Sequence, residues 1–249
     1  PIVLALGGNA IIQKGDDGNV YTQWDRTEAS MRVIAELIDQ DHRFVITHGN
    51  GPQVGQIMMM VDKSQGVVPE VPLGVADAMT AGSMGYMIEQ CLQNALIERG
   101  TFHEVVTVPA QMVVDRRDPA IKHPSKPIGM FFSEQEAKAL MEEKGWTMRE
   151  DAGRGWRRYV ASPYPLDIIE KAAIRRLVEA EIVVITGGGG GIPVYFEPNG
   201  RIEGIDCVID KDLASMKIAL AVGSRLLVIV TGVPQVVLNY GKDDEQPLG

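Results

Sequence analysis

The amino-acid sequence predicts an α/β fold in which a mainly parallel central sheet lies between two layers of helices. Short apolar runs typical of buried strands alternate with segments whose apolar residues recur at helical spacing. Three of the apolar runs end in clusters of glycine. A loop-rich stretch near the middle interrupts this alternation. It predicts a smaller lid subdomain that protrudes from the three-layer sandwich.

In the first half of the chain, strands and helices are expected in turn. The run at 2–6 is continuously apolar and ends in two glycines, which indicates a buried strand and a tight turn. Met31, Ile34 and Ile38 recur at helical spacing, and Pro52 suits the first turn of a helix. The expected elements are a strand at 2–6, a helix within 27–41, a strand at 44–47, a helix from Pro52, a helix at 76–99 and a strand at 105–108.

The middle of the chain has a different character. Residues 115–159 contain Asp-Pro, His-Pro and Lys-Pro steps, which favour loops. Ser133 and Glu136 nevertheless form the capping-box pattern that precedes a helix, here expected at 137–144. We therefore expect an inserted lid at about 115–160.

Beyond the lid the alternation resumes. Asn199-Gly200 predicts a hairpin turn between strands at 194–196 and 201–203. The other expected elements are a helix at 166–181 with Ile169, Ala173 and Leu177 on one face, a strand at 182–186, a helix marked by Leu213, Met216 and Leu220, and a strand at 226–231.

Composition restricts the kind of partner. A formal net charge of −9 and a pI near 5.0 argue against the nucleic-acid backbone as a ligand. No apolar run approaches the roughly 20 residues that a membrane span needs, and no signal peptide is evident. Cys91 and Cys207 form no metal-type pair, and we interpret them as reduced thiols of a cytoplasmic protein.

The glycine clusters give the first indication of chemistry. They are Gly7-Gly8-Asn9, Gly49-Asn50-Gly51 and the five glycines at 187–191, each directly after a predicted strand. Backbone amides in such turns can point at phosphate oxygens, and ligands of parallel sheets bind beyond the carboxyl ends of the strands. A single cluster is more often a structural bend, but three at corresponding strand ends favour an anion site.

Two other anion-binding classes fit less well. The P-loop pattern is absent. The glycines at 49, 51 and 55 resemble a dinucleotide fingerprint, but the acidic residue expected about 20 positions later is missing, which argues against a nicotinamide oxidoreductase.

Charged residues supply what glycines cannot. Asp210, Lys211 and Asp212 stand at the start of a predicted helix, and Lys126 is flanked closely by Pro124 and Pro127. Phosphoryl transfer needs cations on the moving charge and an aligned nucleophile, so these residues are candidates for a phosphate clamp. A charge run at a helix start is also commonly a solvated surface, and that reading stays open at this point.

Five motifs together resemble the carbamate kinases of the amino acid kinase family. They are GGNA at 7–10, HGNGPQVG at 48–55, HPSKPIG at 123–129, TGGGGGIPV at 186–194 and VIDKDLAS at 208–215. They follow the order of the family and cover essentially the whole chain. The long lid is a further point of similarity.

The resemblance implies reversible phosphoryl transfer between ATP and carbamate, with ADP and carbamoyl phosphate as the other pair. By this resemblance, Gly7, Gly8 and Asn9 face the transferred group, Gly49, Asn50 and Gly51 hold the carbamate end, Lys126 and Lys211 offset phosphoryl charge, and Asp212 and Asp210 orient those lysines. The implied nucleotide contacts are Gly187, Gly188, Gly189, Lys211, Thr231, Tyr240 and Lys242, with Mg²⁺ carried on the nucleotide phosphates. No residue is expected to act as a metal ligand or as a covalent nucleophile.

The resemblance also implies a domain plan. Residues 1–222 would form the substrate domain with its lid, and 223–249 the start of a nucleotide-binding domain. Relatives continue into a glycine-rich segment with a further lysine, which this sequence lacks. The resemblance implies a homodimer and a role in ATP formation during arginine or related nitrogen breakdown. The alternatives are a non-catalytic nucleotide- or anion-binding homologue, or a kinase for another small carboxylate or phosphate.

Overall fold

The computed structural model describes residues 1–12, 16, 18–38, 42–151, 153–231, 237–239 and 244–248. A five-stranded sheet in the order β12-β1-β2-β9-β3 forms its centre, and every neighbouring pair is parallel. The strands are β1 (Ile2–Leu6), β2 (Phe44–His48), β3 (Val105–Val108), β9 (Val183–Thr186) and β12 (Leu226–Val230). This confirms the predicted α/β fold with a mainly parallel central sheet.

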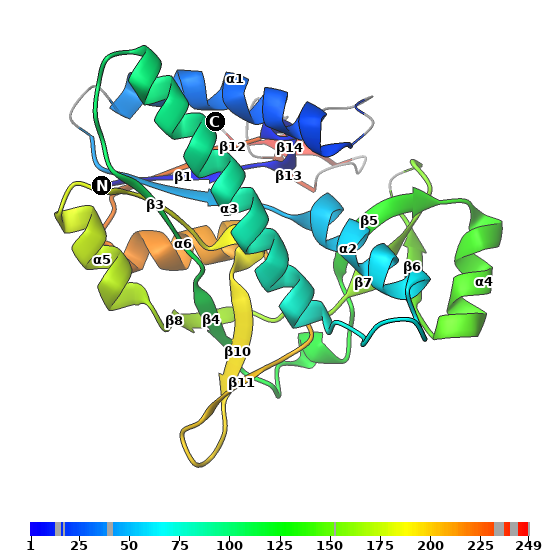
Figure 1. Cartoon of the computed structure of the whole chain (residues 1–249). Helices are drawn as coiled ribbons and strands as arrows, with labels where there is room; N and C mark the ends of the chain where they lie inside the picture. Colours follow the sequence, from blue (N-terminus) through cyan, green and yellow to red (C-terminus); the bar gives the residue numbers. More distant parts are fainter. Residues whose placement is uncertain are drawn as a thin grey trace.

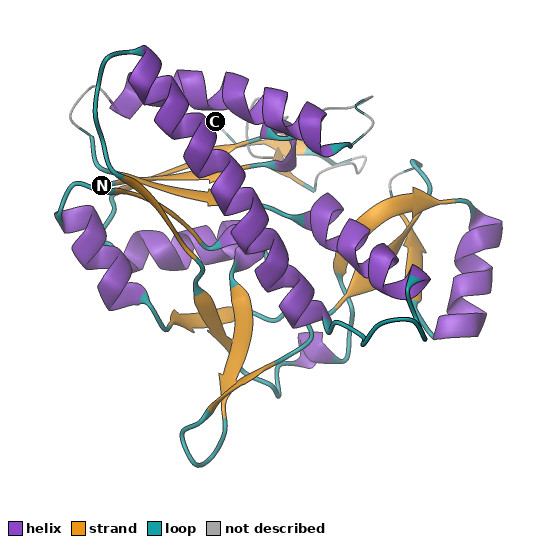
Figure 2. Ribbon diagram, in the orientation of Figure 1, coloured by secondary structure: helices purple, strands orange, loops and turns teal. Residues whose placement is uncertain are grey.

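Helices cover both faces of this sheet, as Figures 1 and 2 show. One face packs against α1 (Val20–Ile38) and α3 (Leu73–Glu98), and the other against α5 (Lys171–Glu179) and α6 (Lys211–Ala221). Successive residues of each strand point to opposite faces of the sheet and so belong to different cores. Leu4 and Ile46 belong to the core under α1 and α3, whereas Val3, Val45 and Val184 belong to the core over α5 and α6. Strands buried on both faces explain why their sequences are continuously apolar.

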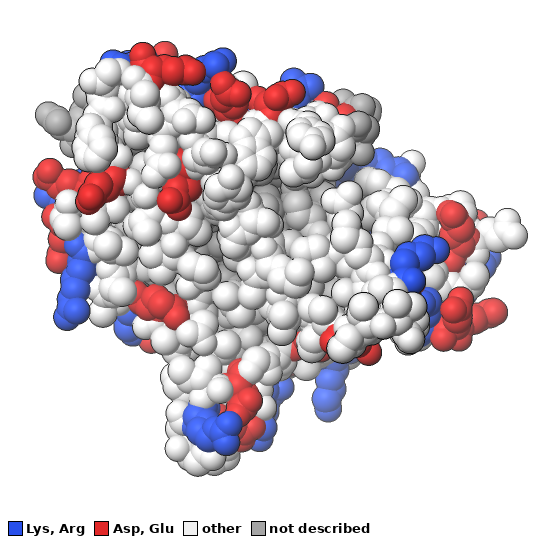
Figure 3. Space-filling model, in the orientation of Figure 1, with Lys and Arg blue, Asp and Glu red and all other residues white. Residues whose placement is uncertain are grey.

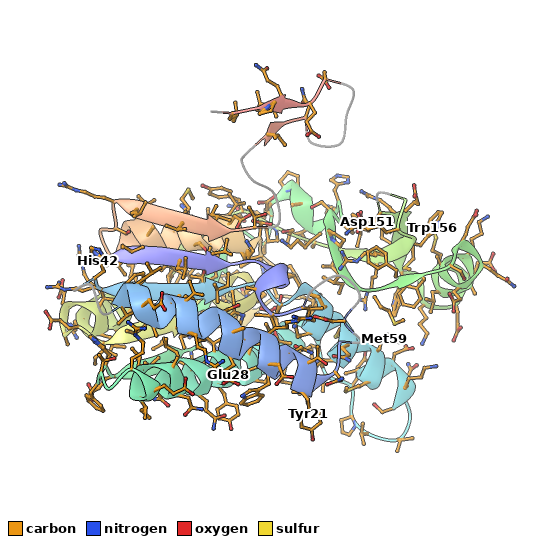
Figure 4. All side chains as sticks on the ribbon, turned by 90° about the horizontal axis from the view of Figure 1, so that it is seen from above. Tyr21, Glu28, His42, Met59, Asp151 and Trp156 are labelled. Carbon is orange, nitrogen blue, oxygen red and sulfur yellow. The ribbon has the colours of Figure 1, made fainter. Side chains whose placement is uncertain are left out.

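Smaller sheets extend from this centre. A four-stranded sheet has the order β11-β10-β4-β8. It contains β4 (Gln111–Val114), β8 (Pro165–Ile168), β10 (Ile192–Phe196) and β11 (Ile202–Gly204), and the predicted hairpin at Asn199-Gly200 joins the last two. β13 (Val237–Leu238) pairs with β14 (Gln246–Pro247), and Figure 4 shows this pair apart from the central sheet. The 3₁₀ turns are η1 (Gly8–Ala10), η2 (Pro119–Ile121) and η3 (Gly188–Gly190).

The lid stands to one side of the central sheet, where Figure 4 labels Asp151 and Trp156. It consists of the sheet β5-β7-β6 and one helix: β5 (Lys126–Phe132), α4 (Glu134–Lys144), β6 (Thr147–Glu150) and β7 (Trp156–Val160). The predicted capping box is present, because the Ser133 side chain accepts from the Glu136 amide and Glu136 accepts from the Ser133 amide. Local sequence alone therefore sets the start of α4.

The contacts that join the lid to α2 (Gly51–Lys63) include a close backbone approach and an ion pair. A Cβ atom on Gly55 would lie 1.9 Å from the Cα of Gly129, so the backbones of α2 and β5 touch where neither residue has a side chain. Lys144, the last residue of α4, forms an ion pair with Asp62 of α2. A groove of about 460 Å³ lies between these elements, and none of the residues that line it belongs to the glycine turns.

The structure corrects two helix predictions. The expected helix at 166–181 is shorter, because residues 165–168 form β8 and pair with β4, for example Ile168 with Met112. A sheet partner distant in sequence overrides the local helical spacing. On α5 the buried residues are Ile174 and Val178, whereas Ala173 of the expected face is exposed.

The expected apolar face of α6 is also wrong. Leu213 and Leu220 are exposed, and the buried side chains include Ala214, Ser215 and Ile218. α6 packs against β1, β8 and the turn η3, and its small buried residues allow the helix to approach them closely. Elsewhere the predicted boundaries move by a few residues: α1 begins at Val20 and α3 at Leu73.

Candidate functional site

The three glycine turns meet at one edge of the central sheet. They follow β1, β2 and β9, which are neighbours in parallel register. Backbone hydrogen bonds connect the strand ends: the Gly7 amide donates to the Val230 carbonyl at 3.0 Å, and the Gly49 amide donates to the Leu6 carbonyl at 3.2 Å. The predicted convergence of the turns is therefore a property of the fold.

The turn at 187–191 is buried and tightly enclosed. Gly189 has a φ of +69°, and a Cβ atom there would lie 2.3 Å from Asn50 Nδ2 and 2.7 Å from Asp77 Oδ1. A residue with a side chain does not fit here, because the positive φ is unfavourable for L-residues and the Cβ atom would overlap Asn50 and Asp77. The turn thus packs directly against Asn50. Gly187, Gly188 and Gly189, which are the predicted nucleotide contacts, are all buried.

Two lysines and two aspartates gather at the start of α6. Asp210 caps this helix by accepting from the Asp212 amide at 2.9 Å. Its other carboxylate oxygen accepts from Lys126 Nζ of the lid at 2.5 Å. Lys211 Nζ donates to Asp212 Oδ1 at 2.5 Å, and the Lys211 stem lies beside Gly49, with Cδ 3.3 Å from where a Cβ would be. The two predicted phosphate-clamp lysines therefore come from different parts of the chain to one place.

Asp210 is anionic in this arrangement. Burial opposes its ionisation, but the charge and hydrogen bond of Lys126, with the amides of Asp212 and Leu213, hold the pKa of its carboxyl below the ordinary value. A negative Asp210 restrains the lid lysine next to the turns and leaves Lys211 with a separate partner.

Residues that the sequence interpretation did not single out complete the site. Asn50 Nδ2 donates to Asp77 Oδ1 and, at 2.7 Å, to Thr80 Oγ1 of α3. Thr47 Oγ1 lies 2.6 Å from Ser215 Oγ, which joins the end of β2 to α6. Ser215 was within a quoted motif, but Asp77 and Thr80 carry no local signal beyond being polar at buried helical positions.

The predicted site residues divide into three groups. Gly49 lies beside the Lys211 stem and Gly51 beside Pro127 of the lid strand that carries Lys126, whereas Gly7, Gly8 and the backbone of Asn9 follow the neighbouring strand β1. Thr231 follows β12 next to Gly7, because Gly7 bonds to the preceding residue of that strand. Tyr240 and Lys242 lie outside the described residues.

Comparison with known proteins identifies the relatives of this chain. The model of the amino acid kinase family matches residues 1–247. The chain belongs to the amino acid kinase family. It is 49% identical over 246 residues to the carbamate kinase of Pyrococcus horikoshii, covering 98% of this chain and 78% of that protein. It is 46% identical to the carbamate kinase-like protein YqeA of Escherichia coli, with coverage of 98% and 78%.

Two solved structures of a carbamate kinase are also similar to this chain. Carbamate kinase from Giardia lamblia bound to citric acid has a TM-score of 0.92 and 42% identity, covering 96% of this chain and 77% of that one. The same enzyme bound to AMP-PNP has a TM-score of 0.86 and 43% identity, covering 99% and 78%. The fold expected from the sequence resemblance is therefore confirmed.

Two buried groups behind the turns of this family member have displaced pKa values. Burial raises the pKa of Asp77 from 3.8 to about 8, although the Asn50 hydrogen bond works in the opposite direction. Burial lowers the pKa of His48 from 6.5 to about 4. The His48 imidazole is therefore uncharged at neutral pH, and its ring packs against Gly188 of the turn.

These pKa values predict how stability depends on pH. Between pH 6.5 and 8, Asp77 is protonated in the native state and ionised in the unfolded state, so its contribution to stability falls as pH rises, by about 1.4 kcal/mol per unit. Between pH 4 and 6.5, His48 has the opposite slope and offsets this fall. Urea unfolding of wild type and Asp77→Asn should therefore show a stability difference that changes by about 2 kcal/mol from pH 6.5 to 8. The same difference at both pH values would contradict the assigned protonation of Asp77.

Proposed function

We propose that this chain catalyses the reversible transfer of a phosphoryl group between ATP and carbamate. The observation that carries the proposal is the meeting of Lys126 and Lys211 at three glycine turns, in a chain that is 49% identical to a carbamate kinase. Two cations and a set of backbone amides suit a reaction in which charge moves between small anions.

The residues divide the work as follows. An oxygen of carbamate attacks the terminal phosphorus of ATP, and the bond from that phosphorus to the bridging oxygen breaks, which releases ADP. The amides at 49–51 and the start of α2 hold the carbamate end. Gly7, Gly8 and Asn9 approach the transferred group, while Lys126 and Lys211 offset its charge. No protein side chain forms a bond to phosphorus.

Each lysine is held ready by a carboxylate. Lys126 lies on Asp210 and Lys211 on Asp212, both at 2.5 Å between nitrogen and oxygen. A phosphoryl group bound between Lys126 and Lys211 would accept hydrogen bonds from both ammonium groups while each lysine stays paired with its aspartate. Asp210 and Asp212 thus act by placing lysines, and the α6 N-terminus adds favourable potential for the anion.

Magnesium belongs to this proposal as part of the nucleotide substrate. Among the described residues, no group of three or more His, Cys, Asp or Glu side chains is placed to hold a metal ion. Asp210 and Asp212 are each engaged by a lysine, which suits an ion that arrives on the nucleotide phosphates. The nucleotide itself is proposed to contact Gly187–189, Thr231, Tyr240 and Lys242, with 223–249 as the start of its domain.

A coupled assay tests the proposed reaction. Purified protein is supplied with ADP, Mg²⁺ and carbamoyl phosphate, and ATP formation is followed with luciferase. We expect ATP from carbamoyl phosphate and at least about 100-fold less from acetyl phosphate, which has a methyl group in place of the amino group. No ATP from carbamoyl phosphate would refute the enzyme, and an equal rate with acetyl phosphate would favour a kinase for another small carboxylate.

A homodimer is the proposed assembly. Val75, Met79, Tyr86 and Ile97 of α3 are each about half exposed or more, and Figure 3 shows few charged side chains over this helix. Apolar surface of this kind is typical of subunit contacts. Light scattering should give twice the mass of the chain, and Met79→Glu should shift the mass toward one chain. A monomeric wild type would contradict this assembly.

The proposed setting is the cytoplasm, with ATP formation during the breakdown of arginine or related nitrogen compounds. No helix in the part of the chain that the structure describes is long and apolar enough to cross a membrane.

A further inference from the structure

The carboxyl group of Asp77 is buried where three parts of the site meet. It comes from α3 and contacts Asn50 in the turn after β2, and it lies beneath Gly189 in the turn after β9. Asp77 and Thr80 have no exposed surface, and Asn50 is 2% exposed. Asp77 Oδ2 has no hydrogen-bond partner among the described residues. Burying a carboxyl group without a full set of hydrogen bonds costs free energy of folding, which indicates that Asp77 has a role at this position.

Asn50 shows what Asp77 does. Asn50 is the N-cap residue of α2, where an asparagine side chain ordinarily accepts a hydrogen bond from an amide of the first helical turn. No such bond forms here. Instead, the two hydrogens of Nδ2 are used by Asp77 Oδ1 and Thr80 Oγ1, which turns the side chain toward α3.

This orientation leaves the start of α2 open. The amides of Gly51 and Gln53 donate to no described residue, and Pro52 between them has no amide hydrogen. They lie at the positive end of a 13-residue helix. Gly51 also faces the lid, since a Cβ on it would lie 4.0 Å from the Pro127 carbonyl oxygen, one residue from Lys126.

We propose that Asp77 is a positioning residue for the phosphoryl-transfer site: it holds the Asn50 side chain away from α2, so that the amides at the α2 N-terminus are available to the carbamoyl end of the substrate. This inference rests on the proposed function. Asp77 touches no reacting atom and acts through Asn50, so its removal should affect the binding of one substrate rather than the chemistry as a whole.

Steady-state kinetics of ATP formation separate these effects. Asp77→Ala removes the acceptor and should raise KM for carbamoyl phosphate about tenfold, with KM for ADP within about twofold and kcat within about threefold of wild type. Asp77→Asn keeps an oxygen at the acceptor position and should restore KM for carbamoyl phosphate to within about twofold. Equal increases in both KM values, an unchanged KM for carbamoyl phosphate, or no rescue by asparagine would overturn the assignment.

Two further variants keep the test decisive. Thr80→Val removes the second acceptor of Asn50 at constant volume and should raise the same KM about threefold, which replaces Asp77→Ala if that variant does not fold. Cys91→Ala is the control, because Cys91 is equally buried on α3 but lies in the core under α1. Both KM values should stay within about twofold of wild type in this control, and an increase like that of Asp77→Ala would overturn the assignment.

Failure of the proposed function is recognised separately. If wild type forms no ATP, calorimetric titration with carbamoyl phosphate and with inorganic phosphate compares wild type with Asp77→Ala. Tenfold weaker binding by the variant would support the positioning role, and equal binding would overturn it.

Discussion

Lys211→Ala is expected to lower kcat for ATP formation at least about 1,000-fold, equivalent to about 4 kcal/mol of transition-state stabilisation. Lys211 reaches the turn at 49–51 from the first residue of α6, and its nitrogen lies 2.5 Å from Asp212 Oδ1. Charge on a transferring phosphoryl group is stabilised mainly by such fixed cations. Alanine removes the cation and leaves the backbone of the turns in place.

Stability should change little in the same variant. The lost ion pair involves Asp212, whose side chain is 48% exposed, so it contributes at most about 1 kcal/mol. Urea unfolding and the coupled assay measure the two effects on one preparation. Lys217→Ala is the control, because Lys217 lies on the same helix but its nitrogen is over the Tyr164 ring, 5.1 Å from the centroid. Retention of more than a tenth of wild-type kcat by Lys211→Ala would refute the assigned role.

Gly189→Ala is expected to destabilise the protein by about 2 to 5 kcal/mol, the sum of a backbone cost and a packing cost. The φ of +69° is unfavourable for alanine, by about 1 to 2 kcal/mol. The new methyl group would also lie 2.3 Å from Asn50 Nδ2, in a turn that is buried on all sides, and overpacking of this kind costs about 1 to 3 kcal/mol more. Urea unfolding gives the free energy, and the coupled assay should show activity lost as Asn50 is displaced.

Gly200→Ala separates the two causes. Gly200 has a similar φ of +83° in the β10–β11 hairpin turn, but nothing lies within 4 Å of its Cβ position. This variant should therefore show only the backbone cost, about 1 to 2 kcal/mol, with unchanged activity. If both variants lost the same free energy, the packing of the 187–191 turn against Asn50 and Asp77 would not be the reason for glycine at 189.

Much of the fold could be predicted because its signals are local. The apolar runs of β1, β2 and β9 need no partner to be recognised as buried strands, and the Ser133–Glu136 pair marks the start of α4 by itself. By contrast, β8 was predicted as helix. Its strand conformation depends on pairing with β4, more than 50 residues earlier in the chain.

The candidate site shows the same division. The glycine turns, Lys126 and Lys211 were recognisable from their motifs, and their chemistry follows from residue type. The resemblance implied that Asp210 and Asp212 orient the two lysines, but it did not say which aspartate holds which lysine. Asp210 lies 84 residues from Lys126 in the chain, so only the folded structure shows that these two form the pair. Asp77 had no signal, because its sequence surroundings are those of an ordinary helix and its burial comes from α3 lying over two turns.

The sequence by itself therefore determined the α/β class, the strand-end glycines and the two lysines that we propose for phosphoryl transfer. These depend on backbone freedom, apolar periodicity and charge, which each residue carries with it. Only the tertiary structure decided which face of α6 is buried, that Asp210 restrains the lid lysine, and that Asp77 turns Asn50 away from α2. Those outcomes depend on the distance between atoms far apart in the chain and on the loss of water around them, and no local pattern encodes either.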